Sequence, residues 1–103
     1  MKLNVMERLL ALQLLPSEGS IVMLKVIREA QDKLGLTEEE IKEFGVKQNE
    51  GTATWNKEGN EEREIAVSVK AQELLADELK KLDEKKKLTR HHVSLYEKFV
   101  MNN

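Results

Sequence analysis

Apolar residues recur every three or four positions between residues 69 and 82, which is the spacing of one face of an α-helix. They form the largest apolar stripe that the pattern offers, and it consists of Ala71, Leu74, Leu75, Leu79 and Leu82. A short break at Leu88 and Thr89 separates this long helix from a last helix, which Thr89 is expected to cap. The rest of the chain must therefore supply the residues that cover the stripe.

Two helices are expected upstream. Residues 5–15 place most of their apolar side chains at helical spacing; Asn4 suits the N-cap, and Pro16 stops the helix because it has no amide hydrogen to donate. Residues 20–34 predict a second helix that is apolar over more than half of its circumference at its start. Gly35 is expected to end this helix in the left-handed conformation.

A third, short helix is predicted by a capping box, in which Thr37 is followed three residues later by Glu40. Its acidic first turn suits the helix dipole. Ile41 and Phe44 are expected to face inward, and Gly45 ends the helix.

From residue 46 the pattern changes to alternation, which is typical of strands. Residues 46–49 and 52–55 flank Glu50 and Gly51, a tight hairpin turn. Residues 64–67 alternate as well and predict a third strand. The expected fold is one α+β domain over residues 1–103, mainly helical, with three N-terminal helices, a small three-stranded antiparallel meander, a long helix that backs this sheet, and a C-terminal helix.

The composition indicates a soluble, heavily charged chain. Hydrophobic residues make up 40% and charged residues 35% of the 103 positions, and the formal net charge is −2. This balance gives no general attraction to nucleic acid or to an anionic membrane, and no apolar run approaches the roughly 18 residues of a membrane span. Glu7 and Arg8 interrupt the apolar start, so a signal peptide is not expected. The absence of cysteine excludes disulfides and thiolate metal sites and favours a cytoplasmic setting.

Motifs for catalysis or cofactor binding are not visible. The five glycines fall at predicted element ends, outside any phosphate-binding pattern. His91 and His92 point about 100° apart on a helix, so they cannot hold one metal together, although either could act as a base with a distant carboxylate. The many carboxylates fall in predicted caps, turns and polar faces. We therefore expect no enzyme, no cofactor and no metal.

The side chains that best suit contact with a partner are aromatic or basic. They are Trp55, Tyr96, Phe99, Lys85, Lys86 and Lys87. Trp55 either packs against a helix or is exposed at an interface, where tryptophan is enriched. Residues 80–90 contain six cations and two acids, a balance of +4 that could contact phosphate or an acidic partner. The lysines fan around the helix, however, so a solvated helix end is the preferred interpretation.

The apolar surplus predicts an interaction or assembly protein without enzymatic activity. The first, second and last helices carry more leucine and valine than one small core can bury, so a protein partner or self-association is expected. The alternative is a DNA-binding module of the winged helix–turn–helix type, since three helices precede a hairpin. Its recognition helix, residues 37–44, would carry four glutamates and one lysine, so nucleic-acid binding is not expected.

Both ends of the chain resemble short uncharacterised proteins of phage or prophage type. The similar stretches are residues 4–10, 14–16, 88–89 and 94–100. Their motifs are structural and carry no catalytic residue across. The resemblance implies a small accessory protein, which agrees with the interpretation of the residues themselves.

Overall fold

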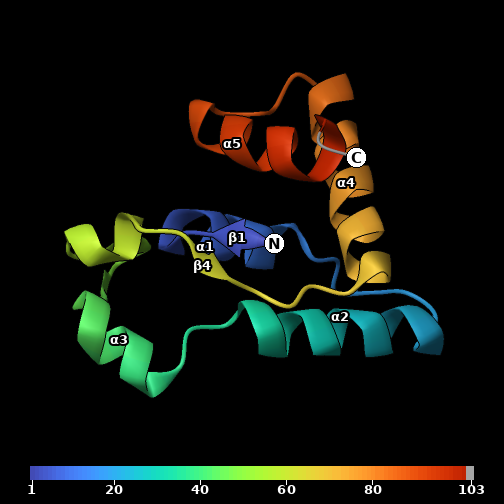
Figure 1. Ribbon diagram of the computed structural model, residues 1–103. Helices are drawn as coiled ribbons and strands as arrows, with labels where there is room; N and C mark the ends of the chain where they lie inside the picture. The colour runs from blue at the N-terminus through green and yellow to red at the C-terminus, as the bar shows by residue number, and fades with distance from the viewer. Residues whose placement is uncertain (102–103) are drawn as a thin grey trace.

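The computed structural model describes residues 1–101, and most of the chain is helical (Figure 1). The helices are α1 (Val5–Leu14), α2 (Ile21–Leu34), α3 (Glu38–Phe44), α4 (Val69–Glu84) and α5 (Val93–Tyr96). The helical turn η1 (Lys57–Asn60) lies between α3 and α4. The turn η2 (Arg90–His92) precedes α5, and the π-helical turn η3 (Glu97–Met101) continues it. The predicted α+β class, mainly helical, is confirmed.

Capping side chains start the helices where the sequence predicts them. In α1 the side chain of Asn4 accepts the amide hydrogen of Glu7 at 2.9 Å, and the Glu7 carboxylate accepts that of Asn4 at 2.9 Å. Thr37 and Glu40 make the same reciprocal pair at the start of α3. These bonds satisfy amide groups that have no partner inside the helix.

Gly35 ends α2 in a conformation that differs from the predicted one. Its φ and ψ are −61° and 147°, an extended conformation rather than the predicted left-handed one. The chain therefore continues without reversal into Thr37, the N-cap of α3. The left-handed conformation occurs at Gly45 instead, where φ is 61° at the end of α3.

The strands within residues 1–101 form two separate two-stranded antiparallel sheets, not the predicted three-stranded meander. In the hairpin, β2 (Lys47–Asn49) pairs with β3 (Thr52–Thr54). The other sheet joins β1 (Lys2–Leu3) to β4 (Arg63–Glu64), which lie far apart in the sequence. The turn η1 redirects the chain after β3, so the segment predicted as a third strand meets the N-terminus rather than the hairpin.

The core forms around α4, as its apolar stripe predicts. Helices α1 and α2 and the turn η3 all contact α4, and in Figure 1 α1 lies between α2 and α5 while α4 crosses their ends. Ala71, Leu75 and Leu79 are completely buried, and Leu82 is half-buried at the far end of the stripe.

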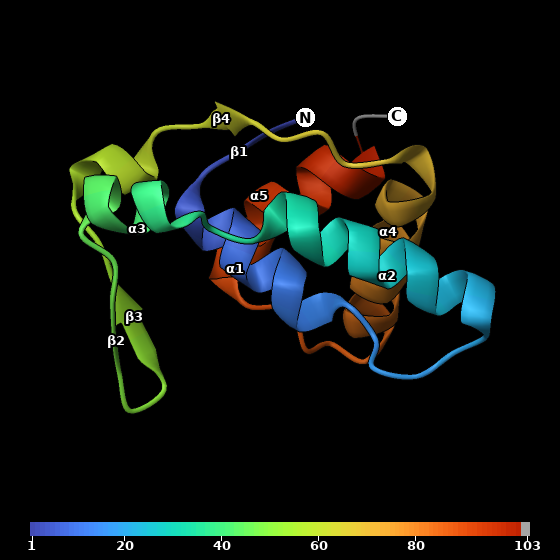
Figure 2. The same ribbon diagram turned by 90° about the horizontal axis from the view of Figure 1, so that it is seen from below.

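The β2–β3 hairpin projects from the body of the protein (Figure 2). Every described residue of its two strands is exposed except Ala53, which is half-buried. The prediction that α4 backs this sheet is therefore wrong. The hairpin instead faces α1, and this arrangement creates the hollow surface described below.

The connection between α4 and α5 is longer than predicted. Helix α4 ends at Glu84, and Lys86 takes a left-handed conformation with φ of 57°. Lys85, Lys86 and Lys87 thus follow the helix rather than forming its last turn. Beyond the break, Leu95 and Phe99 enter the core.

Candidate functional site

An apolar groove runs between α1 and the β2–β3 hairpin. It consists of two hollows, of about 690 Å³ and about 420 Å³, which share Leu9 on α1 and Gln48 on β2. His91, from the turn η2, lines the larger hollow. Figure 2 shows the hairpin standing away from the helices on this side of the molecule. We call these two hollows together the hairpin groove.

The side chains that line the hairpin groove are uncharged, apart from His91, which can gain a proton. The lining consists of Met6, Leu9, Leu10, Leu12, Gln13, Leu36, Ile41, Val46, Gln48, Gly51, Thr52, Ala53, Trp55 and His91. None of these described residues is an aspartate, glutamate, lysine or arginine. Three other hollows on the described surface each include carboxylates and lysines. The groove therefore differs chemically from the rest of a heavily charged surface.

The floor of the groove is the apolar surplus of α1. Val5 and Ala11 are buried in the interior, whereas Met6, Leu9 and Leu10 are half-buried and line the groove. A helix with apolar residues on more than one face cannot bury all of them in a single small core. The remaining face of α1 is therefore only half-buried and forms the floor of the groove.

The hairpin forms the wall opposite α1, and its turn sets which residues face the groove. Glu50 and Gly51 have positive φ values of 37° and 84°, as a tight two-residue hairpin turn requires. Gln48 and Ala53 are opposite each other in the ladder and both line the groove. Lys47 and Thr54, the next pair in the ladder, do not line the groove, as the alternation of side chains along a strand predicts.

Trp55 is held at the base of the hairpin. Its indole nitrogen donates a hydrogen bond to Asn60 Oδ1 at 3.0 Å. Gly59 lies directly against the ring, because a Cβ at this position would be only 2.6 Å from Trp55 Cδ1. The ring is half-buried and lines the larger hollow. Trp55 therefore packs on the turn η1 and also presents part of its surface to the groove.

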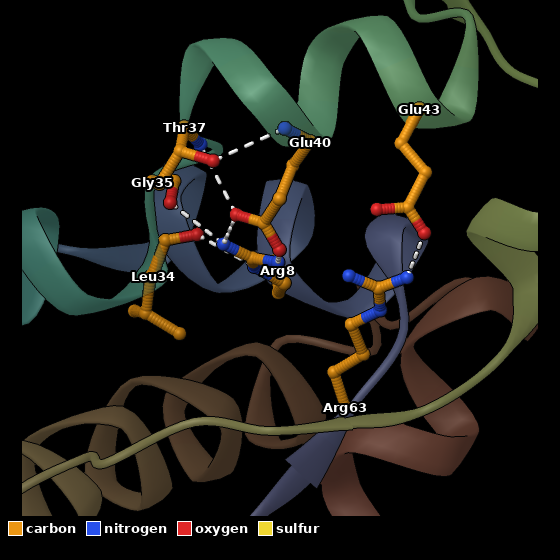
Figure 3. Close-up of polar contacts among 7 residues, drawn as sticks. All are labelled: Arg8, Leu34, Gly35, Thr37, Glu40, Glu43 and Arg63. Carbon is orange, nitrogen blue, oxygen red and sulfur yellow. Dashed lines mark hydrogen bonds and ion pairs between the residues drawn. The ribbon is translucent and has the colours of Figure 1, made fainter.

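A buried arginine fixes α1 to the junction of α2 and α3 (Figure 3). Arg8 is only 3% exposed. Its guanidinium donates to the Leu34 carbonyl at 2.9 Å and to the Gly35 carbonyl at 2.6 Å, and to both carboxylate oxygens of Glu40 at 2.7 and 3.0 Å. The hydrogen bonds from Arg8, together with bonds from Thr37, lower the pKa of Glu40 to about 2. This clamp holds α3, and with it the hairpin, at a defined distance from α1.

A second set of contacts forms at the C-terminal end of α3, where the hairpin begins. Arg63 pairs with Glu43 (Figure 3). The Arg63 guanidinium also lies 4.5 Å from the centre of the Phe44 ring. Asn56, just after the hairpin, donates through its side chain to the Glu43 carbonyl and through its amide to the Phe44 carbonyl. At the other end of the hairpin, the Val46 amide donates to the Ile41 carbonyl at 3.0 Å, so both ends are tied to α3.

The other buried charge of α1 is Glu7. Its carboxylate accepts a hydrogen bond from Lys98 Nζ at 2.8 Å, and Lys98 also donates to the Lys2 carbonyl and pairs with Glu62. Burial alone would lower the pKa of Lys98, but the bonds to Glu62 and Glu7 outweigh it and raise the pKa. This network ties η3 to α1 and β1.

The residues predicted as an interaction surface do not form one surface. Trp55 lines the hairpin groove. Tyr96 is half-buried, and its hydroxyl lies 3.5 Å from Asp83 on α4. Phe99 is only 2% exposed, because it packs into the core against α4, so it is corrected from a surface residue to a core residue. The three lysines are exposed on the connection after α4 and do not line the groove.

Several groove residues were missed. Ile41 was predicted to face inward, but it is 41% exposed and lines the smaller hollow with Val46 and Leu36. The leucines of α1 lie on more than one face of the helix, and this pattern predicts that some of them stay outside the core. The sequence pattern does not predict where the hairpin lies, because the position of the hairpin depends on contacts of Arg8 and Arg63 between distant segments.

Comparisons with protein-family models, curated proteins and solved structures find no match to this chain. Over residues 1–101, none of the helices is long and apolar enough to cross a membrane. The same part of the chain contains no group of three or more histidine, aspartate or glutamate side chains placed to hold a metal ion. The groove is therefore interpreted from its own geometry.

Proposed function

We propose that this chain is a small interaction protein without enzymatic activity, and that it binds an apolar segment of a protein partner in the hairpin groove. The observation that carries the proposal is the lining of the groove. In a chain with 35% charged residues, the described lining has no carboxylate, lysine or arginine. Contiguous apolar hollows with a polar surround are typical of protein-binding sites.

The exposure of the hairpin supports the same proposal. A two-stranded hairpin is marginally stable in water unless another element packs on it. Here only Ala53 is partly covered among the described strand residues, and the groove separates the strands from α1. An apolar segment in the groove would contact Ala53 and Trp55 on one side and Leu9 on the other. Binding would therefore bury the exposed faces of both walls at once.

The experiment compares two glutamates on opposite faces of one strand. Ala53→Glu places a charge in the groove, whereas Thr54→Glu places the same charge on the face that does not line it, beside Lys47 in the ladder. Immobilised wild type and both variants are used to capture proteins from an extract of the source cells, with quantification by mass spectrometry. An unpaired charge is costly to desolvate, so Ala53→Glu should weaken capture at least about a hundredfold, while Thr54→Glu captures as wild type does.

Equal capture by wild type and Ala53→Glu would refute the proposal. Sedimentation of the purified protein at tens of micromolar tests whether the bound segment comes from a second copy of this chain. If wild type forms a dimer that Ala53→Glu disrupts and Thr54→Glu does not, the segment that occupies the groove belongs to a second copy.

A second candidate function is DNA binding of the winged-helix type. It is favoured by the order of α2, the short connection to α3, and the projecting hairpin that follows. The charges of α3 oppose it: Glu38 and Glu39 are exposed, and a negative field repels phosphate. A gel shift at low salt with duplex DNA distinguishes the two candidates, because binding at micromolar protein would favour the DNA-binding alternative.

A further inference from the structure

The last helical segment, η2 with α5 and η3, begins with an unusual cap. Thr89 occupies the N-cap position, and its backbone amide donates a hydrogen bond to Nδ1 of His92 at 3.0 Å. The Thr89 hydroxyl lies 2.9 Å from the same nitrogen. A residue three positions after the N-cap usually returns such a bond through glutamate or glutamine. Here a histidine takes that place, and a histidine can lose its acceptor by protonation.

The bond defines the protonation state of His92. A backbone amide can only donate, so Nδ1 must carry a lone pair and the proton of the neutral ring must be on Nε2. In the imidazolium both nitrogens carry hydrogen. The Thr89 hydroxyl can rotate and accept a hydrogen bond from the protonated Nδ1. The Thr89 amide, which can only donate, then faces an N–H group and loses its acceptor. The added positive charge also lies at the N-terminus of a helix, where the dipole disfavours it.

Burial and the neighbouring histidine favour the neutral ring. Burial lowers the pKa of His92, and the neighbouring His91 lowers it further. Within seven positions along the chain, the charged groups are Arg90, the exposed lysines 85–87, Glu97 and Lys98. On the helices around the segment, the titratable groups of α1 are Glu7 and Arg8, which bind Lys98 and Glu40. At the end of α4, Asp83 lies at the Tyr96 hydroxyl.

The cap matters because the segment behind it is short. Its α5 portion spans only Val93–Tyr96, and the chain continues as the π-helical turn η3. The segment covers the core with Leu95 and Phe99, which are both buried. A helix this short depends on its cap and its packing rather than on its own hydrogen bonds.

We propose that the Thr89–His92 pair is a pH-sensitive cap, which loosens the C-terminal segment of residues 90–101 when His92 gains a proton in mildly acidic solution. Because folding favours the neutral form of His92, the contribution of the cap is complete above the ordinary histidine pKa near 6.5. It is lost as the pH falls below that value. This inference does not depend on what the hairpin groove binds.

Amide hydrogen exchange by NMR tests the proposal on the intact chain. Wild type is compared with His92→Gln, which keeps an acceptor that does not titrate, and with His91→Gln, which removes the other histidine. After correction for intrinsic exchange rates, amides of residues 93–99 in wild type should lose about fivefold protection between about pH 7.5 and about pH 5.5, the effect of one helix cap. His92→Gln should show no such loss. His91→Gln should keep the loss but begin it at a higher pH, because His91 no longer lowers the pKa of His92.

Two results would overturn the proposal. One is a loss of protection in His92→Gln equal to that of wild type, which would assign the pH dependence to another group. The other comes from the ¹⁵N shifts of the histidine side chain near pH 7.5. A proton on Nδ1 of His92, rather than on Nε2, would exclude the bond from Thr89 even if every variant folds normally.

Discussion

Replacing Glu40 with glutamine should destabilise the protein through the buried arginine beside it. Glu40 accepts two hydrogen bonds from Arg8, which is 3% exposed. Within residues 1–101, the other acceptors of this guanidinium are the neutral carbonyls of Leu34 and Gly35. Glutamine preserves the shape of the side chain and one acceptor but removes the negative charge. The guanidinium would then be buried as an uncompensated cation.

The size of the effect follows from the pKa of Glu40, which folding lowers from 4.5 to about 2. At about 1.4 kcal/mol for each pKa unit, the ionised carboxylate would contribute up to roughly 3 kcal/mol. Solvent reaches part of this carboxylate and screens the interaction, so we expect about 2 kcal/mol. Because the pKa is lowered on folding, this stabilisation is complete above pH 4.5 and is lost as the pH falls towards 2.

Urea unfolding of wild type and Glu40→Gln at about pH 7 and about pH 2 measures this contribution. The variant should lose about 2 kcal/mol at neutral pH and no more than about 0.5 kcal/mol at about pH 2, where the wild-type carboxyl is already about half protonated. Glu39→Gln is the matched control, because Glu39 is exposed on the same helix, and it should change the free energy of unfolding by less than about 0.5 kcal/mol. Equal stability of Glu40→Gln and wild type at neutral pH would refute the reasoning, as would a difference that persists unchanged near pH 2.

Three further substitutions test the core and the turns. Leu79→Ala removes a completely buried side chain from α4 and should lower the free energy of unfolding in urea by about 3 kcal/mol; a loss below about 1 kcal/mol would mean that the stripe does not face the core. Lys86→Gly relieves a left-handed residue with φ of 57° and should raise that free energy by about 0.5–1 kcal/mol, whereas destabilisation would contradict the observed conformation. Glu50→Asn gives the hairpin the Asn-Gly turn that positive φ values favour, so amides of β3 should exchange more slowly, and faster exchange would argue against this turn.

The parts of the fold that depend on neighbouring residues could be predicted from the sequence. The caps at Asn4 and Thr37, the hairpin around Glu50 and Gly51, and the apolar stripe of α4 each follow from residues within a few positions of one another. Such signals reflect local hydrogen bonding and helical or strand periodicity.

Long-range pairings could not be predicted in the same way. The strand β1 is two residues long and has its partner, β4, some sixty positions away, so no local pattern distinguishes it. The alternation at Ile65 and Val67 does reflect burial, but both residues lie beyond the ladder. Sequence spacing reports which side chains are buried, and it does not report what buries them.

The site was predictable only in part for the same reason. Of the proposed surface residues, Trp55 lies in the hairpin groove, while Phe99 is buried because the last segment folds back onto α4. The leucine surplus of α1 predicted apolar side chains outside the core, and Leu9 and Leu10 line the groove. The position of the groove depends on Arg8 and Arg63, whose contacts join segments that are 20 or more residues apart in the sequence.

The central claim is that the hairpin groove binds a protein, and photo-crosslinking tests it most directly. A photoreactive amino acid is placed at Gln48, which lines the groove, or at Lys47, which is paired with Thr54 on the other face of the hairpin. Irradiation in the source cells should give a protein adduct from position 48 and little or none from position 47. Equal adducts from both positions, or none from position 48, would contradict the assignment of the groove as the binding site.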